Sequence, residues 1–386
     1  MKRWKYYTAV LLGAALMTIG MTGCGATDKG VGAAGTGEKS ASKQSETTAE
    51  KGTKETTEEA TEQLPAYVPV NPDDVPENAE DDFIFEVDQY GHGTISGYRG
   101  SATQVKVPAN LGGADRILIK TDVFQKNQNI TYVYLPETVI GIGEEGFYGC
   151  DALEELYIAG SATIPKGLCE YDKNLRRVVM EQASLIDGEK EYGAFYKCTS
   201  LTDVVFPETL KGIGFYAFAG CSQLRAVDLS STQVEELGGR AFGECDLLEE
   251  VKLPGSVTKL YAGAFYNCQS LKSFLPGDGS TIEVEDGLVY DGDTLLFGLI
   301  GLEKEEAVIR EGTVKVEDWA FMEDKNLKKV VFPDSISKIG DLVRVFYGNE
   351  VITYKGTEYQ PDPESWKKLE TAIDARKKRE PAAAAQ

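Results

Sequence analysis

Apolar and polar residues recur along most of this chain with a period of 23 or 24 residues. Each unit begins with an aromatic residue, has a cysteine three positions later and a leucine three positions after that, as in Phe195, Cys198 and Leu201. A short apolar and polar alternation follows, frequently ends at a proline, and leads through a turn to a second apolar pair. Alternation with period two predicts a β-strand, and a fixed period of this length predicts a solenoid of stacked coils.

The units share the pattern Phe-x-x-Cys-x-x-Leu. Clear copies begin at Phe147, Phe195, Phe218, Phe242 and Phe265, and degenerate copies begin at Phe124, Cys169 and Phe321. We predict an α/β repeat solenoid in which each coil has a short strand, a second extended arm and a short helical corner that carries Ala-Phe. Stacking aligns the strands into a parallel β-sheet on one face and buries the apolar positions as ladders. The predicted structural ladder includes Phe195, Cys198, Phe218, Cys221, Phe242, Cys245, Phe265 and Cys268.

Two places depart from the repeat. The interval between Phe265 and Phe321 is longer than two coils, and residues 285–301 within it alternate around Asp291-Gly292, a hairpin turn signal. We therefore predict an inserted β-hairpin near residues 285–301. In the unit at Cys169 the aromatic residue is replaced by cysteine and the cysteine by Asp172, so we expect local repacking or a shallow cavity.

At this point the sequence resembles a known family. The units, and above all AFGECDLLEEVKLPGSVTKLYAGAF at residues 241–265, are similar to the BspA-like leucine-rich repeats of bacterial surface proteins. Residues 83–108 resemble the first cap of that family, and EVITYKGTEYQ at residues 350–360 resembles its closing strand. The resemblance covers residues 83–360 and implies a right-handed, curved leucine-rich-repeat stack. It also implies display outside the cell and adhesion to host or neighbouring-cell molecules, and it implies no reaction.

The N-terminus has the features of an export signal. Basic residues precede an apolar run that is too short and too abruptly ended for a membrane span, and the run ends in Met21-Thr22-Gly23-Cys24, which resembles the bacterial lipobox. We predict a lipoprotein signal peptide at residues 1–23, with Cys24 as the lipid attachment site and a location on the outside of a bacterial cell membrane. Residues 24–82 are polar and contain few large apolar residues, so we predict a disordered tether.

The composition argues against nucleic acid as a partner. The net charge is −22 with no basic stripe that contains aromatic residues, so binding of nucleic acid is not expected.

The C-terminus predicts one more element. Within residues 361–386, Asp362 and Pro363 are suited to begin a helix that extends from Glu364 to Arg379. Its apolar stripe of Trp366, Leu369 and Ile373 is expected to cover the last coil, and the remaining tail is expected to be disordered.

The cysteines are interpreted as structural. A nucleophilic cysteine needs a base and a zinc site needs four converging ligands, but the only histidine, His92, lies far from the cysteine units in the sequence. Disulfides are the second alternative, although equivalent residues of a ladder point in parallel rather than at each other. No cofactor and no enzymatic activity are predicted. The acidic residues Glu283, Glu285, Asp286, Asp291 and Asp293 leave calcium binding open, although they lack the spacing of a known calcium loop.

A binding face is predicted from the outward positions of the strands. The residues before and after each central buried position point to the exposed side of the sheet. Aromatic and branched residues gather at these positions in the N-terminal half: Tyr132, Tyr134, Tyr157, Val179 and Val205. Together with Arg177 from the same columns they form the predicted binding face. Exposed tyrosines on a rigid scaffold commonly anchor partners, although tyrosine and valine also favour strands for reasons of sheet stability.

We therefore predict a lipid-anchored, monomeric surface protein that recognises an extracellular protein or glycan through this sheet. A structural spacer of the envelope without a specific ligand is the main alternative, and a surface hydrolase is the third.

Overall fold

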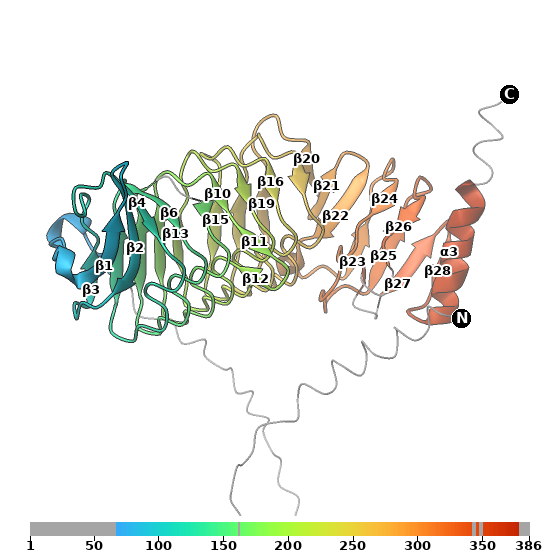
Figure 1. Cartoon of the computed structure of the whole chain (residues 1–386). Coiled ribbons are helices and arrows are strands. Elements are labelled where there is room, and N and C mark those ends of the chain that lie inside the picture. Colours follow the sequence, from blue (N-terminus) through green and yellow to red (C-terminus); the bar gives the residue numbers. More distant parts are fainter. Residues whose placement is uncertain (1–66, 161–162, 342–344, 347–349, 378–386) are drawn as a thin grey trace, which may run out of the picture. The chain divides into compact units, whose positions relative to one another are not determined.

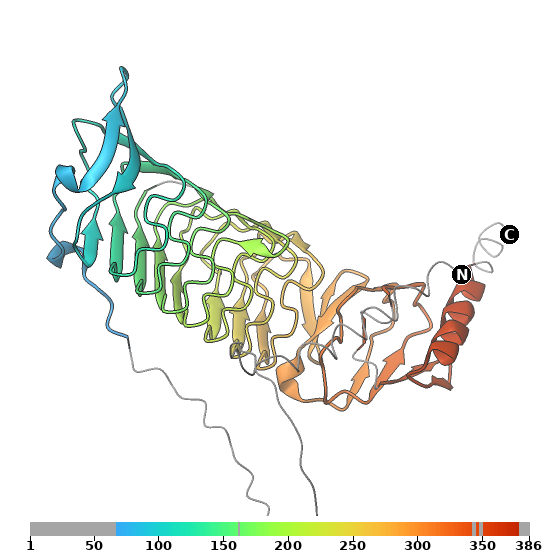
Figure 2. The same cartoon turned by 60° about the horizontal axis from the view of Figure 1, so that its bottom comes forward.

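The computed structural model describes residues 67–160, 163–341, 345–346 and 350–377. These residues form the predicted solenoid, in which successive coils stack through parallel strands (Figures 1 and 2). The predicted signal peptide, the lipid site at Cys24, most of the predicted tether and the predicted C-terminal tail lie outside the described residues. Among the described residues, no helix is long and apolar enough to cross a membrane.

The first arm of each coil carries the strand that follows the Phe-x-x-Cys-x-x-Leu corner. Equivalent strands of successive coils pair in parallel. Each residue lies opposite the residue at the same position in the next coil, as Tyr132 lies opposite Glu155 and Glu155 opposite Arg177. The ladder is divided into three sheets. In stacking order these are β3 (Gln104–Lys106), β5 (Tyr132–Leu135), β7 (Glu155–Ile158), β9 (Arg177–Met180) and β13 (Asp203–Val205); then β15 (Ala226–Asp228), β17 (Glu250–Lys252) and β19 (Ser273–Leu275); then β23 (Glu306–Val308), β25 (Lys329–Phe332), β27 (Val351–Tyr354) and the antiparallel β28 (Thr357–Tyr359).

The second arm also forms parallel strands, which the sequence pattern had suggested only as an extended segment. These strands are shorter, because the chain bends again within a few residues to reach the corner. They are β4 (Arg116–Ile119) and β6 (Val139–Ile142); β8 (Thr163–Ile164), β10 (Leu185–Ile186), β14 (Gly212–Ile213), β16 (Glu236–Leu237) and β18 (Lys259–Leu260); and, further on, β24 (Lys315–Val316) and β26 (Lys338–Ile339). A small hairpin of β11 (Gly188–Glu189) and β12 (Tyr192–Gly193) projects from one coil.

The corners are turns and not the short helices that we predicted. Each corner is built from successive turns, such as those in which the amide of Cys198 donates to the carbonyl of Phe195 and that of Leu201 donates to Cys198. A left-handed residue two positions before the aromatic residue, such as Arg240, and another directly before the cysteine, such as Glu244 or Gly220, interrupt any helix. The α/β description therefore overstates the helical content of the repeats.

The core is the predicted ladder of side chains. Phe195, Phe218 and Phe242 stack with centroid separations of 5.0 and 5.2 Å, and their rings are completely buried. Phe124 and Phe147 form an equivalent stack at 5.0 Å. The two stacks are separated by the unit at Cys169, where the aromatic residue is missing. Burial of rings between successive coils supplies stabilisation that a single coil lacks.

The inserted hairpin is confirmed and is larger than predicted. It is formed by β21 (Leu288–Asp291) and β22 (Thr294–Gly298), which pair antiparallel around Gly292, and β20 (Ile282–Glu285) adds a third strand to it. β22 pairs with β24 and thereby returns the chain to the repeat. The described apolar core is divided into two clusters at this hairpin, with Phe297 packed on the first and Leu288 and Leu295 in the second.

Both ends of the stack are covered. At the N-terminal end, β1 (Phe83–Val87) and β2 (His92–Tyr98) form an antiparallel pair that joins β4, and the short helices η1 (Pro72–Asp74) and η2 (Glu80–Asp82) precede it. At the other end, α3 (Pro363–Lys377) covers the last coil as predicted, with Leu369 and Ile373 buried and Asp362 accepting the amides of Glu364 and Ser365 (Figure 1). A third short helix, η3 (Ile300–Leu302), follows the inserted hairpin.

Candidate functional site

The two outward columns predicted from the sequence are present in the structure. In the parallel ladder, Tyr132, Glu155, Arg177 and Asp203 stand opposite one another on β5, β7, β9 and β13. Tyr134, Tyr157, Val179 and Val205 form the second row. Alternation of side chains along each strand places both rows on the side of the sheet that faces away from the ladder core. We call this surface the tyrosine face.

The exposure of the tyrosine face differs from the prediction. Val205 is exposed, but only 1% of Tyr132 and 5% of Val179 is accessible to solvent. Tyr134 and Tyr157 are half-buried and their rings lie 5.1 Å apart at a tilt of 37°. Tyr157 donates a hydrogen bond to Glu181, and the ammonium of Lys106 lies 5.2 Å from the centre of the Tyr134 ring. The face is therefore a packed aromatic surface rather than a row of free side chains.

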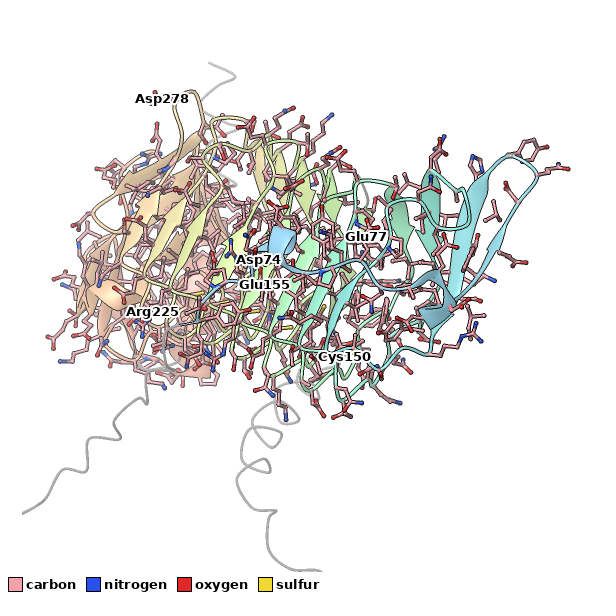
Figure 3. The ribbon with its side chains drawn as sticks, turned by 90° about the vertical axis from the view of Figure 1, so that its left-hand side faces the viewer. Asp74, Glu77, Cys150, Glu155, Arg225 and Asp278 are labelled. Carbon is pink, nitrogen blue, oxygen red and sulfur yellow. The ribbon has the colours of Figure 1, made fainter. Side chains whose placement is uncertain are left out.

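Tyr132 and Glu155 are buried because the segment preceding the solenoid lies over them. Residues 67–78, which we call the strap, cross the first strands of the sheet. Figure 3 shows the part of the strap that carries Asp74 and Glu77 in front of these strands, with Glu155 next to it. We had assigned these residues to the disordered tether. That assignment is wrong for residues 67–82, because the strap is fixed by hydrogen bonds to the solenoid and η2 joins it to β1.

Glu155 is the main contact of the strap. The phenol of Tyr67 donates to Glu155 Oε2 at 2.8 Å, and the amide of Val70 donates to the same oxygen at 3.0 Å. Burial and the neighbouring carboxylate raise the pKa of Tyr67, which keeps the phenol protonated as a donor. Arg177 Nε lies 3.9 Å from Glu155 Oε1 and 3.1 Å from a carboxylate oxygen of Asp203. The guanidinium therefore compensates part of the negative charge of the buried Glu155 carboxylate.

The other end of the strap is fixed to the edge strand β3. The amide of Asn78 donates to the carbonyl of Lys106 at 3.0 Å, and the Asn78 side chain accepts from the Lys106 amide at 2.8 Å. The ammonium of Lys106 donates to the carbonyl of Pro72 at 2.9 Å. The strap therefore extends from β7, past Tyr134, to the outer edge of β3.

The cysteines occupy the positions expected for a structural ladder. Apart from Cys169, which replaces the aromatic residue of its unit, the described thiols each donate to a carbonyl of the preceding coil, for example Cys198 Sγ to the carbonyl of Cys169 at 2.9 Å and Cys268 Sγ to that of Phe242 at 3.1 Å. Burial raises the pKa of the Cys150 and Cys268 thiols to about 12, which disfavours the reactive thiolate. The six described cysteines are free thiols and no disulfide joins them. His92 pairs with Asp88 in the N-terminal hairpin and not with a cysteine.

Where a corner has no cysteine, a carboxyl or amide group takes its place. Asn127 and Asp324 accept amides of their own turn. Asp172 behaves differently, because its Oδ1 accepts the amide of Cys150 in the preceding coil at 2.7 Å. Burial raises the pKa of Asp172 to about 8, and burial together with Glu145 raises that of Glu170 to about 7. Both acids lie away from the tyrosine face.

The acidic hairpin has no cluster suited to a metal. Glu283 and Glu285 both pair with Arg310, and Asp286 pairs with Lys304. Within the described part of the chain, no group of three histidine, cysteine, aspartate or glutamate residues could hold a metal ion. The hairpin instead borders an open groove of about 660 Å³, lined by β19, β20 and Arg310.

A second aromatic surface was not found from the sequence. It follows the corners and contains Tyr148, Tyr171, Tyr196, Tyr216, Tyr266 and Trp319. Neighbouring rings meet edge to face, and the guanidinium of Arg240 lies beside both Tyr266 and Trp319, 4.1 and 5.0 Å from the two ring centres. A tyrosine directly after the ladder phenylalanine, at residues 148, 196 and 266, was the available signal. Because the rings contact each other and the cations, this surface stabilises the stack.

Comparisons with known proteins agree with the repeat pattern. A family model described as the BspA type leucine rich repeat region matches residues 101–187, 189–285 and 301–355, in six copies. A search of curated proteins gives no match.

Several solved structures are similar to this chain. A leucine rich cell surface protein from Faecalibacterium prausnitzii is 21% identical, over 69% of this chain and 73% of that one, with a TM-score of 0.47. A leucine rich repeat protein from T. pallidum is 28% identical, over 52% of this chain and 83% of that one, with a TM-score of 0.38. The pneumococcal vaccine antigen PcpA is 16% identical, over 70% and 68% of the two chains, with a TM-score of 0.43.

Proposed function

Because this chain belongs to the BspA-type leucine-rich repeat family, whose pattern covers more than half of its residues, we propose that it is a binding scaffold on the bacterial cell surface. In this proposal the rigid parallel ladder presents the tyrosine face to an extracellular protein or glycan. The repeats contribute the rigidity, and the outward side chains contribute the recognition.

The observation that carries the proposal is the tyrosine pair. Tyr134 and Tyr157 stand on adjacent strands with their rings in contact, and each remains partly accessible. Paired rings held by a ladder lose little conformational freedom on binding, which is why such residues dominate the energetics of many interfaces. Lys106, Arg177 and Asp203 surround the pair with charges of both signs, which can orient a partner.

Attachment to the membrane is the second part of the proposal. It is supported by the sequence pattern that ends at Cys24 and by the polar segment that follows it. A multi-acyl lipid anchor would retain the mature protein on the outer side of the membrane. Metabolic labelling with a radioactive fatty acid tests this step: the native chain should be labelled and partition with membranes, while Cys24→Ser should be unlabelled. Labelling of both chains, or of neither, would contradict an anchor at Cys24.

The binding step is tested with extracts of host matrix, mucin and bacterial surfaces. Saturable retention of the native chain is expected, and the double variant Tyr134→Ser/Tyr157→Ser should weaken it at least tenfold while nearly preserving the melting temperature. Asp228→Ser/Lys252→Ser is the matched control, because both residues occupy the same outward column on β15 and β17. Equal retention by both double variants would contradict the tyrosine face, and no retention of the native chain would favour a structural spacer.

A further inference from the structure

The strap has the chemistry of a peptide ligand. Its prolines at residues 69, 72 and 76 restrict the backbone, which is extended at Asn71 and Val75 on either side of the single turn η1 (Pro72–Asp74). Extended proline-rich segments dock on aromatic surfaces at low entropic cost, because much of their conformational freedom is already lost before binding. Here the carbonyl of Pro72 is held by Lys106, whose ammonium also lies over the Tyr134 ring.

The strap uses only part of the hydrogen-bonding capacity beneath it. Glu155 Oε2 accepts two donors from the strap, but the buried Glu155 Oε1 and the buried hydroxyl of Tyr132 have no hydrogen-bond partner among the described residues. Buried polar groups are normally satisfied, and unsatisfied groups at a surface indicate a site that another ligand could complete.

The strap is also held by few apolar contacts. Of its residues, only Val75 is buried, whereas 81% of the Val68 side chain is exposed. Its firm attachment is at Asn78, where both the backbone and the side chain pair with Lys106. A segment with this distribution of contacts opens locally from its N-terminal end without unfolding the coils below.

We propose that the surface beneath the strap binds an extended, proline-rich peptide segment of a partner protein, with a tyrosine hydroxyl and a backbone amide directed at Glu155. The strap is then a built-in competitor that occupies this surface until the partner displaces it. This inference rests on the proposed function, because it specifies the partner class for the same tyrosine face.

The test begins with a folded chain that carries a protease site inserted between Ala79 and Glu80. After cleavage and removal of the N-terminal fragment, the protein is titrated with a fluorescent synthetic peptide, YVPVNPDDVPENA, which corresponds to residues 67–79. Saturable binding is expected, with at least tenfold weaker binding to the uncleaved chain. The peptide with alanine at its three proline positions should bind at least fivefold more weakly, because it loses its preference for the extended form.

The variants locate the site. Glu155→Gln in the cleaved protein should weaken binding of the peptide at least tenfold, whereas Glu250→Gln, the same position of the column on β17, should leave it unchanged. Failure of the folded, cleaved protein to bind the peptide, or equal losses in both variants, would overturn the inference. Exchange of labelled straps between copies to form a dimer would also overturn it, because the occupant would then be a second copy of the chain.

A measurement on the uncleaved chain covers the case in which cleavage unfolds the protein. The Val70 amide should exchange its hydrogen at least tenfold faster than the amides of β7, because the strap opens by itself. If the Val70 amide and the β7 amides exchange only through global unfolding, the strap is an integral part of the fold and the inference is overturned. If the surface extracts retain the native chain but the cleaved protein does not bind the peptide, the proposed function stands and only this inference is refuted.

Discussion

The buried carboxyl of Asp172 gives a quantitative test of the ladder. Its side chain is completely inaccessible to solvent, and Oδ1 accepts the Cys150 amide at 2.7 Å. No hydrogen-bond partner is found for Oδ2 among the described residues. Burial raises the pKa of Asp172 to about 8 from an ordinary value of 3.8, although the amide hydrogen bond acts in the opposite direction. The acid is therefore protonated in the folded protein at neutral pH.

The sign of the pH effect follows from this difference. Between pH 3.8 and about 8 the folded chain binds a proton at Asp172 that the unfolded chain has released. The free energy of unfolding is therefore highest below this window and falls as the pH rises through it. At 1.36 kcal/mol per pKa unit, the full shift from 3.8 to about 8 corresponds to an upper limit of about 6 kcal/mol. Glu170 contributes in the same direction, because its folded pKa is also raised.

Asp172→Asn should remove most of this pH dependence. Asparagine keeps the oxygen that accepts the Cys150 amide and does not ionise. Urea unfolding followed by circular dichroism at pH 5, 6 and 7 is the assay, with Asp115→Asn, an exposed aspartate outside the corners, as the control. We expect the native chain and the control to lose several kcal/mol between pH 5 and 7, and Asp172→Asn to lose about 2 kcal/mol or less from the remaining acids. Parallel pH curves for all three chains would refute the assignment.

Three further predictions concern the corners. Cys198→Ala should lower the free energy of unfolding by about 1–3 kcal/mol, because it leaves a small cavity and removes a thiol hydrogen bond. Binding at the tyrosine face should not change. Urea unfolding measures the first effect, and retention of the chain by surface extracts measures the second. A thiol reagent counted by mass spectrometry should leave the six described cysteines unmodified in the native protein and modify them on unfolding, because all six are buried; labelling without unfolding would contradict the ladder. Arg240→Gln should lower the free energy of unfolding in urea by about 1 kcal/mol, because the cation that lies against the rings of Tyr266 and Trp319 is lost. An unchanged urea midpoint would contradict a stabilising role for this surface.

The stacked part of the fold could be predicted because the same physical requirement recurs in every coil. Phe195, Cys198 and Leu201 must each fill an equivalent inward position, so their spacing alone revealed the ladder. The outward rows followed from strand alternation for the same reason. The helical corners were predicted wrongly, because left-handed conformations that interrupt them fall on residues that carry no turn signal of their own, such as Arg240 and Glu244.

The strap could not be predicted from the sequence. Its residues include few large apolar side chains, and this composition is typical of a disordered tether. What orders it is a set of specific hydrogen bonds to Glu155 and Lys106, residues that are distant in the sequence and carry no pattern. For this reason Tyr132 was expected on an open face and is in fact covered. The site follows from repeat geometry, but its accessibility depends on a non-repeating segment.

The most direct test of the binding account is site-specific crosslinking. A photoreactive benzophenone amino acid is placed at position 205, which is exposed on the tyrosine face and leaves the tyrosine pair intact, or at position 261 in the second arm beyond β18. Each protein is illuminated with mucin, matrix and bacterial surface extracts. The account predicts a discrete, saturable adduct from position 205 that is missing from position 261 and is competed by unlabelled native chain. Adducts from position 261 alone, or equal adducts from both positions, would contradict binding through the tyrosine face.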